Sequence, residues 1–393
     1  MQPRTRWVIS TDNLNDLNTG LQPEPRPGVP LLLVDDVAEP VVCFWMMALA
    51  QRHSPDTVET YSRAIEAWWR MLLLRKLRWW EITSVEFQAW TQKLRQDGLK
   101  TSSLHTLGAA VCSFYKWAHA SGYIDRVPFR ISDGRWKSKG GRGAAAAEPP
   151  KVDLGTVRLE KPRIVTAEQF DRILANIPHR DPGLVRRDEL MAQCGKWVGL
   201  RRMEVVGIKV SQLRGVMEVS LGPNAPIPFF ALELDPESTK GKKGGLVLVI
   251  PMLVKKFRDY IAPGGYRDQI VERARQRAKR SGENYVEPDE VFLTDRGAPF
   301  KRETLSSYYR LSARKAQVDS RFHRLRHTAA TNVAQVTFDR GSKGYQVVQN
   351  LLRHSDEKTS RIYIDQVATQ SEMYQSLMSL NDLAIMEERW KAG

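Results

Sequence analysis

A glycine-, alanine- and lysine-rich segment near the middle of the chain is the feature that most constrains the fold. Between Asp133 and Gly143 four basic residues stand among glycines, and four alanines and Pro149-Pro150 follow. Such a segment cannot bury enough apolar surface to order itself, so it predicts a basic flexible linker over residues 131–160. The chain should therefore fold as two domains, since about 150 residues per domain is usual.

The part before the linker has the pattern of a helical bundle. Ser54-Pro55 suits a helix start, because a serine caps free amides and a proline fits the first turn. Two more helices are expected, one from near Thr83 to Gly98 and one that ends near Gly122. Apolar residues at helical spacing mark the buried faces: Val58, Tyr61, Ile65, Trp68 and Leu72, then Phe87, Trp90 and Leu94, then Leu104, Leu107, Val111, Phe114 and Trp117. The pattern predicts an all-helical domain over residues 41–130. A proline-rich N-terminal arm over residues 1–40 precedes it, in which residues 30–34 could add a strand.

Helices, a small sheet and further helices are expected after the linker. Helices should follow Thr166, cover 187–198 and resume from about residue 252. Three β-like runs lie between them, at 217–221, 229–234 and 246–250. The last two flank a Lys/Gly-rich turn, which indicates an antiparallel hairpin. The order predicts an α+β domain over residues 161–370 and a C-terminal tail over 371–393, so the fold class is mainly α with a small antiparallel sheet.

Composition limits the classes of function. Lys and Arg total 60 against 45 Asp and Glu, and the formal net charge of +15 favours a polyanionic partner. No apolar run approaches the roughly 20 residues that span a bilayer, so nucleic acid is favoured over a membrane. The linker charges would suit a phosphate backbone or a solvated tether equally well. No segment resembles a signal peptide and the three cysteines are far apart, so a cytoplasmic, nucleoid-associated protein with reduced core thiols is expected.

Histidines, arginines and a tyrosine gather between His323 and Tyr363. The stretch contains His323-Arg324-Leu325-Arg326-His327-Thr328, then Leu351-Leu352-Arg353-His354-Ser355, then Tyr363. With Arg201 upstream, these side chains could bind a phosphodiester, move its protons and attack its phosphorus. Two guanidiniums can each donate paired hydrogen bonds to non-bridging oxygens and stay charged at any working pH. We assign that clamp to Arg201 and Arg326.

Tyr363 is the expected nucleophile. A free phenol has a pKa near 10, so only about one in 1000 is ionised at pH 7 and a cationic pocket with a base should help to form the phenolate. His323 is the candidate for that proton transfer, because imidazole titrates near neutrality. His354 is expected to bond a phosphate oxygen. Glu204, one helical turn after Arg201, is expected to orient a catalytic side chain or the hydrogen bonds of the site.

In combination these motifs resemble the tyrosine site-specific recombinases, or phage integrase family, over roughly residues 41–370. Gly199-Leu200-Arg201-Arg202-Met203-Glu204 is similar to the first arginine box of that family and His323-x-x-Arg326 to the second. Leu352-x-His354, with Tyr363 nine residues later, is similar to the third. The resemblance implies a SAM-like core-binding domain and a catalytic domain that cuts and rejoins double-stranded DNA through a 3′-phosphotyrosyl bond. It also implies a homotetramer that joins two specific sites through a four-way junction.

The resemblance further implies that a lysine of the hairpin turn protonates the leaving 5′-hydroxyl. Lys240 best matches the family pattern, and Lys242 is the alternative. No metal, ATP or other cofactor is expected, because arginine and lysine supply the charge neutralisation that Mg²⁺ gives in nucleases. The chain departs from the family at Arg353, where a glycine usually precedes the histidine. That arginine would add a phosphate contact or lie exposed.

Other functions remain open from the sequence. A type IB topoisomerase-like DNA-relaxing enzyme would use the same chemistry, but the helical bundle and the nine-residue spacing argue against it. A non-catalytic DNA-binding accessory protein of the same fold would not need the complete set of catalytic residues. His323 and His327 have the i,i+4 spacing of metal sites, yet the helical glutamate of metalloproteases is missing between them. The apolar spacing in the tail suits packing on its own domain or on a neighbouring subunit, and accessory proteins are left open.

Overall fold

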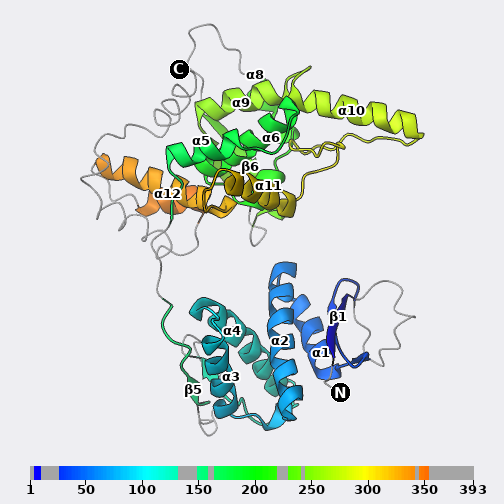
Figure 1. Cartoon of the computed structure of the whole chain (residues 1–393), viewed down its shortest axis with the longest axis vertical. Helices are drawn as coiled ribbons and strands as arrows, with labels where there is room; N and C mark the ends of the chain where they lie inside the picture. Colours follow the sequence, from blue (N-terminus) through cyan, green and yellow to red (C-terminus); the bar gives the residue numbers. More distant parts are fainter. Residues whose placement is uncertain are drawn as a thin grey trace. The chain divides into compact units, whose positions relative to one another are not determined.

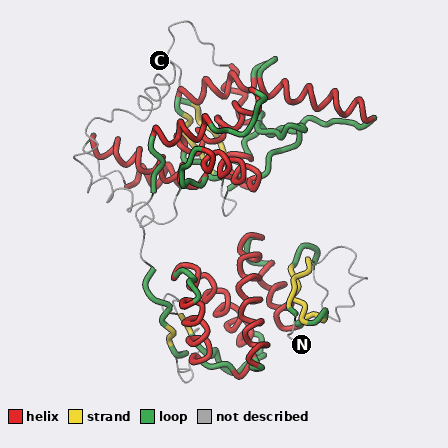
Figure 2. Tube along the Cα trace, in the orientation of Figure 1, coloured by secondary structure: helices red, strands yellow, loops and turns green. Residues whose placement is uncertain are grey.

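The computed structural model describes residues 4–9, 26–131, 148–157, 163–218, 229–239, 244–340 and 345–353. The chain forms two compact units, unit 1 (Met1–Leu159) and unit 2 (Glu160–Gly393), each with its own apolar core (Figure 1). Helices dominate both units and the strands are short (Figure 2). The expected fold class, mainly α with a small antiparallel sheet, is confirmed.

Unit 1 is a helical bundle whose helices lie where the sequence predicts them. They are α1 (Pro40–Ala50), α2 (Pro55–Arg75), the 3₁₀ turn η2 (Trp79–Glu81), α3 (Ser84–Gln96) and α4 (Thr101–Ala120). The predicted faces bury Trp68 and Phe114 completely. The start of α3 has a capping box between Thr83 and Glu86. The expected amide cap of α2 is wrong, because the hydroxyl of Ser54 lies 3.1 Å from that of Thr57 and bonds it instead.

The described part of the predicted N-terminal arm forms a sheet on this bundle. Strands β1 (Thr5–Ile9), β2 (Pro30–Val34) and β3 (Val37–Ala38) are antiparallel in that order. The strand expected at residues 30–34 is therefore present. Its residues Leu31, Leu32 and Leu33 are buried in the apolar core that the bundle helices also form. These residues belong to unit 1 because burial of three leucines holds them there.

Part of the predicted linker is also held by unit 1. Strand β4 (Arg130–Ile131) pairs in parallel with β5 (Lys151–Val152). Val152 and Leu154 are fully buried in the core of unit 1, and Arg95 of α3 donates a 2.8 Å hydrogen bond to the carbonyl of Leu154. Residues 148–157 are thus no flexible tether, because two apolar side chains and a backbone pairing fix them. Residues 132–147 lie outside the described part of the chain.

Unit 2 combines helices with a two-stranded hairpin. Its N-terminal elements are α5 (Ala167–Ala175), α6 (Pro182–Gln193), the π-helical turn η3 (Cys194–Val198), α7 (Arg202–Val206), the 3₁₀ turn η4 (Ser211–Leu213) and α8 (Arg214–Glu218). The hairpin strands are β6 (Phe230–Leu234) and β7 (Gly245–Val249), with the 3₁₀ turn η5 (Pro236–Ser238) between them. The remaining helices are α9 (Pro251–Ile261), α10 (Tyr266–Ser281), α11 (Arg302–Lys315), α12 (Phe322–Asp339) and α13 (Tyr345–Leu352).

The hairpin prediction is confirmed, and one strand prediction is wrong. Strands β6 and β7 are antiparallel, and alternate residues such as Leu232 and Val247 face the core. Met217 and Glu218, the first residues of the β-like run at 217–221, instead end helix α8. Val216, just before them, is buried and continues the helix from η4, so helical packing overrides the local β pattern. Residues 219–221 lie outside the described segments.

Two glycines let helix α12 approach the turn η3 closely. A Cβ atom on Gly195 would lie 2.9 Å from the ring of Phe322, and one on Gly199 would lie 3.4 Å from the Cβ of Ala329. Gly199 also has a φ of 71°, in the left-handed region that glycine adopts without strain. The backbone of the turn that precedes Arg201 therefore lies directly against the helix that carries Arg326.

The three cysteines are buried and reduced, as the sequence predicts. Cys43, Cys112 and Cys194 are buried free thiols. Burial raises the pKa of Cys43 and of Cys112 to about 11, so both thiols stay protonated and unreactive at pH 7. No helix in the described part of the chain has both the length and the apolar character needed to cross a bilayer.

Candidate active site

Glu204 is the centre of the candidate site. Its carboxylate is completely buried at the first turn of α7. Oε2 accepts a 2.7 Å hydrogen bond from the backbone amide of Arg201, and Oε1 accepts a 2.8 Å bond from Nη1 of the same residue. The Arg201 side chain is still 28% exposed. Glu204 therefore fixes the guanidinium of Arg201 from the protein side, while part of the Arg201 side chain stays open to solvent.

Arg326 of α12 lies behind this pair. Its guanidinium is buried and donates hydrogen bonds to the backbone carbonyls of Gly199 and Leu352. Nη1 of Arg326 lies 3.9 Å from Oε2 of Glu204. One side chain thus ties α12 to the turn before Arg201 and to the end of α13, and it adds its charge to the same pocket.

Arg353 contributes a third guanidinium. It directly follows α13, and its Nη2 lies 2.5 Å from Oε2 of Glu204. Of the two alternatives for Arg353, a phosphate contact or an exposed position, the exposed position is wrong, because only 15% of this side chain is accessible. Desolvation lowers the pKa of Arg353, as does the neighbouring Arg201, while Glu204 acts in the opposite direction. Three guanidiniums around one carboxylate leave the pocket with two positive charges in excess.

His323 lies at the first turn of α12, where it is exposed to solvent and close enough to Arg326 and Arg201 to feel their charges. Its ring is perpendicular to that of His327, with 4.6 Å between the ring centres. Desolvation, then the neighbouring His327, Arg326 and Arg201, lower the pKa of His323 to about 4. The imidazole is therefore neutral at pH 7 and able to accept a proton. Among the described residues, no group of three or more His, Cys, Asp or Glu side chains could hold a metal ion.

We expect His323 to titrate well below the ordinary range of a histidine. Its ring resonances, assigned by comparison with a His323→Gln variant, should begin to shift only below about pH 5 in an NMR titration, since the folded pKa is near 4. The folded protein then binds fewer protons than the unfolded chain between pH 4 and 6.5, so His323 lowers stability as pH falls through that window. A bound anion should raise the pKa. A midpoint near 6.5 without anion would show that the ring does not feel the cationic pocket.

The structure brings Arg201, Glu204, His323 and Arg326 together. Lys240, the alternative Lys242, His354 and Tyr363 lie outside the residues that the structure describes. Their described neighbours still bear on the site. Gly244 donates its amide to Oγ1 of Thr239 at 2.9 Å, so the two ends of the segment with Lys240 and Lys242 lie together. Arg353, immediately before His354 in sequence, contacts Glu204.

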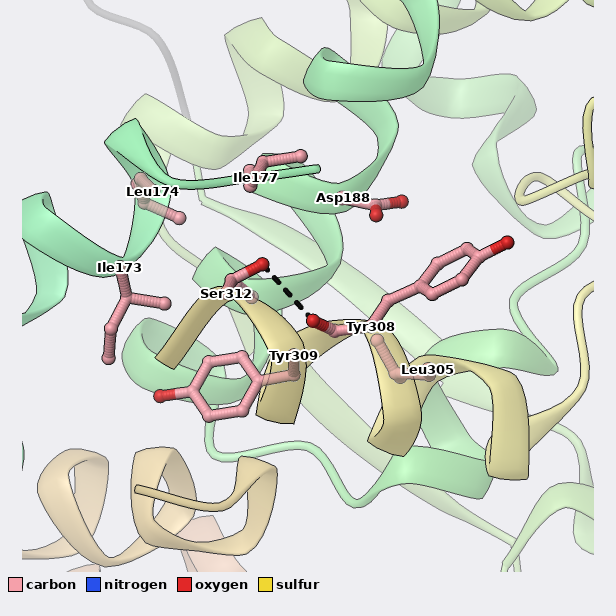
Figure 3. A pocket seen from close by; sticks show the side chains of 9 residues that line it. Ile173, Leu174, Ile177, Asp188, Leu305, Tyr308, Tyr309 and Ser312 are labelled. Carbon is pink, nitrogen blue, oxygen red and sulfur yellow. Dashed lines mark hydrogen bonds between the residues drawn. The ribbon is translucent and has the colours of Figure 1, made fainter. Parts of the chain in front are cut away.

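A separate small cavity in unit 2 does not suit a phosphodiester. Figure 3 shows it between α5, α6 and α11, with Ile173, Ile177, Tyr308 and Asp188 among its lining side chains. Ser312 donates its hydroxyl to the backbone carbonyl of Tyr308 at 3.1 Å. The cavity has a volume of about 10 Å³, which is no more than one water molecule needs. It is therefore a packing defect and not a substrate site.

Both units match known protein families. Residues 163–370 match the Phage integrase family, and residues 44–122 match the Phage integrase, N-terminal SAM-like domain. The chain belongs to the phage integrase family. The expected SAM-like domain and the catalytic domain of this family are therefore both present.

Relatives and solved structures agree with this membership. Tyrosine recombinase XerD of Proteus mirabilis is 26% identical over 323 residues, which cover 80% of this chain and 84% of the relative. Tyrosine recombinase XerC of Roseiflexus castenholzii is 26% identical over 319 residues, which cover 79% and 83%. The crystal structure of the XerH site-specific recombinase bound to a palindromic difH substrate, a post-cleavage complex, is 14% identical with a TM-score of 0.54. The match covers 86% of this chain and 84% of that chain, and it shows a shared fold.

Proposed function

We propose that this protein is a site-specific DNA recombinase or integrase that cuts and rejoins duplex DNA through a covalent 3′-phosphotyrosyl intermediate. One observation supports this reaction more than any other. Arg201 and Arg326 meet on the buried carboxylate of Glu204, and the neutral imidazole of His323 lies beside them. The pocket therefore combines an excess of positive charge with a proton acceptor, which is what attack on a phosphodiester anion needs.

The arginines would stabilise the charge that develops on the phosphate. Arg201, with its partly exposed guanidinium, binds the non-bridging oxygens directly. Arg326 adds its positive charge from the buried side, where few water molecules screen it. Because these charges are fixed before the substrate arrives, little reorganisation is needed as the phosphorus becomes five-coordinate.

In strand cleavage one phosphorus–oxygen bond forms, another breaks, and two protons are transferred. The oxygen of Tyr363 attacks the phosphorus, and its phenolic proton passes to His323. The bond from phosphorus to the 5′-oxygen breaks, and that oxygen takes a proton from Lys240 or, as the alternative, from Lys242. His354 bonds a phosphate oxygen. One phosphate ester replaces another, so the reverse attack by a 5′-hydroxyl rejoins the strand without ATP or a metal ion.

We further propose that four copies of the chain act together on two specific DNA sites. Exchange of one pair of strands would give a four-way junction, and exchange of the second pair would resolve it. Membership of the phage integrase family supports this assembly, as does the two-domain organisation with matches in both units. The C-terminal residues 371–393 would pack on a neighbouring subunit in that assembly.

The test of this function is a suicide substrate, a duplex with a nick just beyond the cleavage position so that the cut end diffuses away. Substrates are tiled across the junctions of the genetic element that encodes the protein. We expect a band on denaturing gels that joins protein and DNA through a 3′-phosphate and that resists high salt but not protease. If no junction substrate gives such a band, the proposed reaction is wrong. If a monomer relaxes plasmids without any site, the topoisomerase alternative is correct.

A further inference from the structure

Arg353 has a backbone conformation that needs a compensating interaction. Its φ is +50°, in the left-handed region, at the position that ends helix α13. A residue other than glycine is strained there relative to right-handed backbone, and glycine is the usual choice at such helix ends. The contacts of the Arg353 side chain therefore decide what an arginine contributes at this place.

The side chain reaches the centre of the candidate site. Nη2 lies 2.5 Å from Oε2 of Glu204, which is fully buried, and Nη1 donates a 3.3 Å hydrogen bond to the carbonyl of Leu351. The two charges lie away from solvent, where an ion pair with hydrogen-bonded partners is strong and its disruption costly. Glu204 already accepts from Arg201, so Arg353 and Arg201 share one carboxylate.

The stem of the same side chain covers the start of strand β7. A Cβ atom built on Gly245 would lie 2.9 Å from Cδ of Arg353, so the stem occupies the space that a side chain would need. Gly245 follows Gly244, whose amide bonds Thr239 across the ends of the segment that contains Lys240. Arg353 thus contacts the turn of Arg201 and Glu204, the end of α13 and the hairpin.

We propose that Arg353 is a positioning residue for strand cleavage, and this inference rests on the proposed function. It supplies part of the positive charge that Glu204 requires. Without it, the carboxylate would draw the guanidinium of Arg201 inward, away from the phosphate. It also holds the hairpin at a fixed distance from Glu204. Its effect therefore falls on the rate of cleavage and not on the affinity for DNA.

The test compares Arg353→Gly with a matched control, Lys76→Gly. Lys76 also has a positive φ, of 55°, at the end of a helix, so both variants relieve the same backbone cost. We expect Arg353→Gly to slow single-turnover cleavage of a saturating suicide substrate by about 10- to 100-fold, the usual cost of misplaced groups. Its DNA dissociation constant should stay within about twofold of the native value. Lys76→Gly should cleave at the native rate, and Arg353→Lys should recover part of the loss because it keeps the charge.

A double-mutant cycle between Arg353 and Glu204 distinguishes the positioning role of Arg353 from a direct contact with phosphate. In a Glu204→Gln background, Arg353→Gly should slow cleavage by a smaller factor than it does in the native protein, because the charge that Arg353 offsets is gone and only its contact with the hairpin is lost. The same pair should be non-additive in urea unfolding, a readout that needs no DNA. If Arg353→Gly instead weakens DNA binding and reduces the salt slope of binding by about one, Arg353 contacts phosphate and the positioning role is wrong. Additive unfolding would also overturn it, whereas absence of adduct in the native protein would overturn the proposed function alone.

Discussion

We expect replacement of Tyr363 by phenylalanine to abolish the covalent protein–DNA adduct while duplex binding survives. The change removes one oxygen atom, the proposed nucleophile, and leaves the charges of Arg201, Arg326 and Glu204 in place. Loss of the nucleophile in other covalent catalysts costs about 10⁶-fold, so the adduct should fall below detection. Single-turnover reactions with the suicide substrate measure the adduct, and a gel-shift titration measures binding.

Tyr260→Phe is the matched control for this experiment. The hydroxyl of Tyr260, in helix α9, is buried and has no hydrogen-bond partner among the described residues. Its removal should not weaken the fold, because no bond is lost and a buried polar group is removed. The control should therefore form adduct at the native rate. An adduct formed by the Tyr363→Phe variant would show that another side chain attacks the DNA.

Spacing within the sequence predicts which residues of each motif lie together, because each motif lies on one local element. Arg201 and Glu204 share the first turn of α7, and His323 and Arg326 share the first turn of α12. That the two elements meet follows from Gly195 and Gly199, whose missing side chains let α12 approach η3. Only the resemblance to a family predicts this contact between α12 and η3, because no local pattern in the sequence specifies it.

The place of Arg353 was not predictable from its neighbours in sequence. Its partner Glu204 lies 149 residues away, and no local pattern reports a contact at that separation. The sequence does contain one signal, which is an arginine at the position where the family uses glycine. A non-glycine residue is strained in the backbone conformation that glycine adopts there, and another interaction must offset that strain. The same limit explains the linker. Averaged composition over 131–160 hides the apolar residues Val152 and Leu154, and Leu154 occupies space that the missing side chain of Gly108 in α4 leaves open.

Replacement of Arg326 by alanine should reduce cleavage by at least about 100-fold and should also destabilise unit 2. The guanidinium is buried and donates to the carbonyls of Gly199 and Leu352, so its loss leaves both acceptors unpaired. It also removes a cation 3.9 Å from the buried carboxylate of Glu204, and breaking a buried pair from one side costs about 3 to 5 kcal/mol. Urea unfolding measures the second effect and single-turnover cleavage per folded molecule the first.

Variants of two other arginines separate the effect on cleavage from the effect on stability. Arg187 is a buried arginine in the same unit, paired with Asp188 at 2.7 Å and bonded to the carbonyl of Leu293. Arg187→Ala should therefore destabilise the protein to a similar degree without slowing cleavage by the folded fraction. Arg201 is 28% exposed, so Arg201→Ala should slow cleavage at least as much as Arg326→Ala with a smaller loss of stability. If Arg326→Ala cleaves as fast per folded molecule as Arg187→Ala, then Arg326 only holds α12 against the turn before Arg201, and the charge on the phosphate is neutralised by other groups.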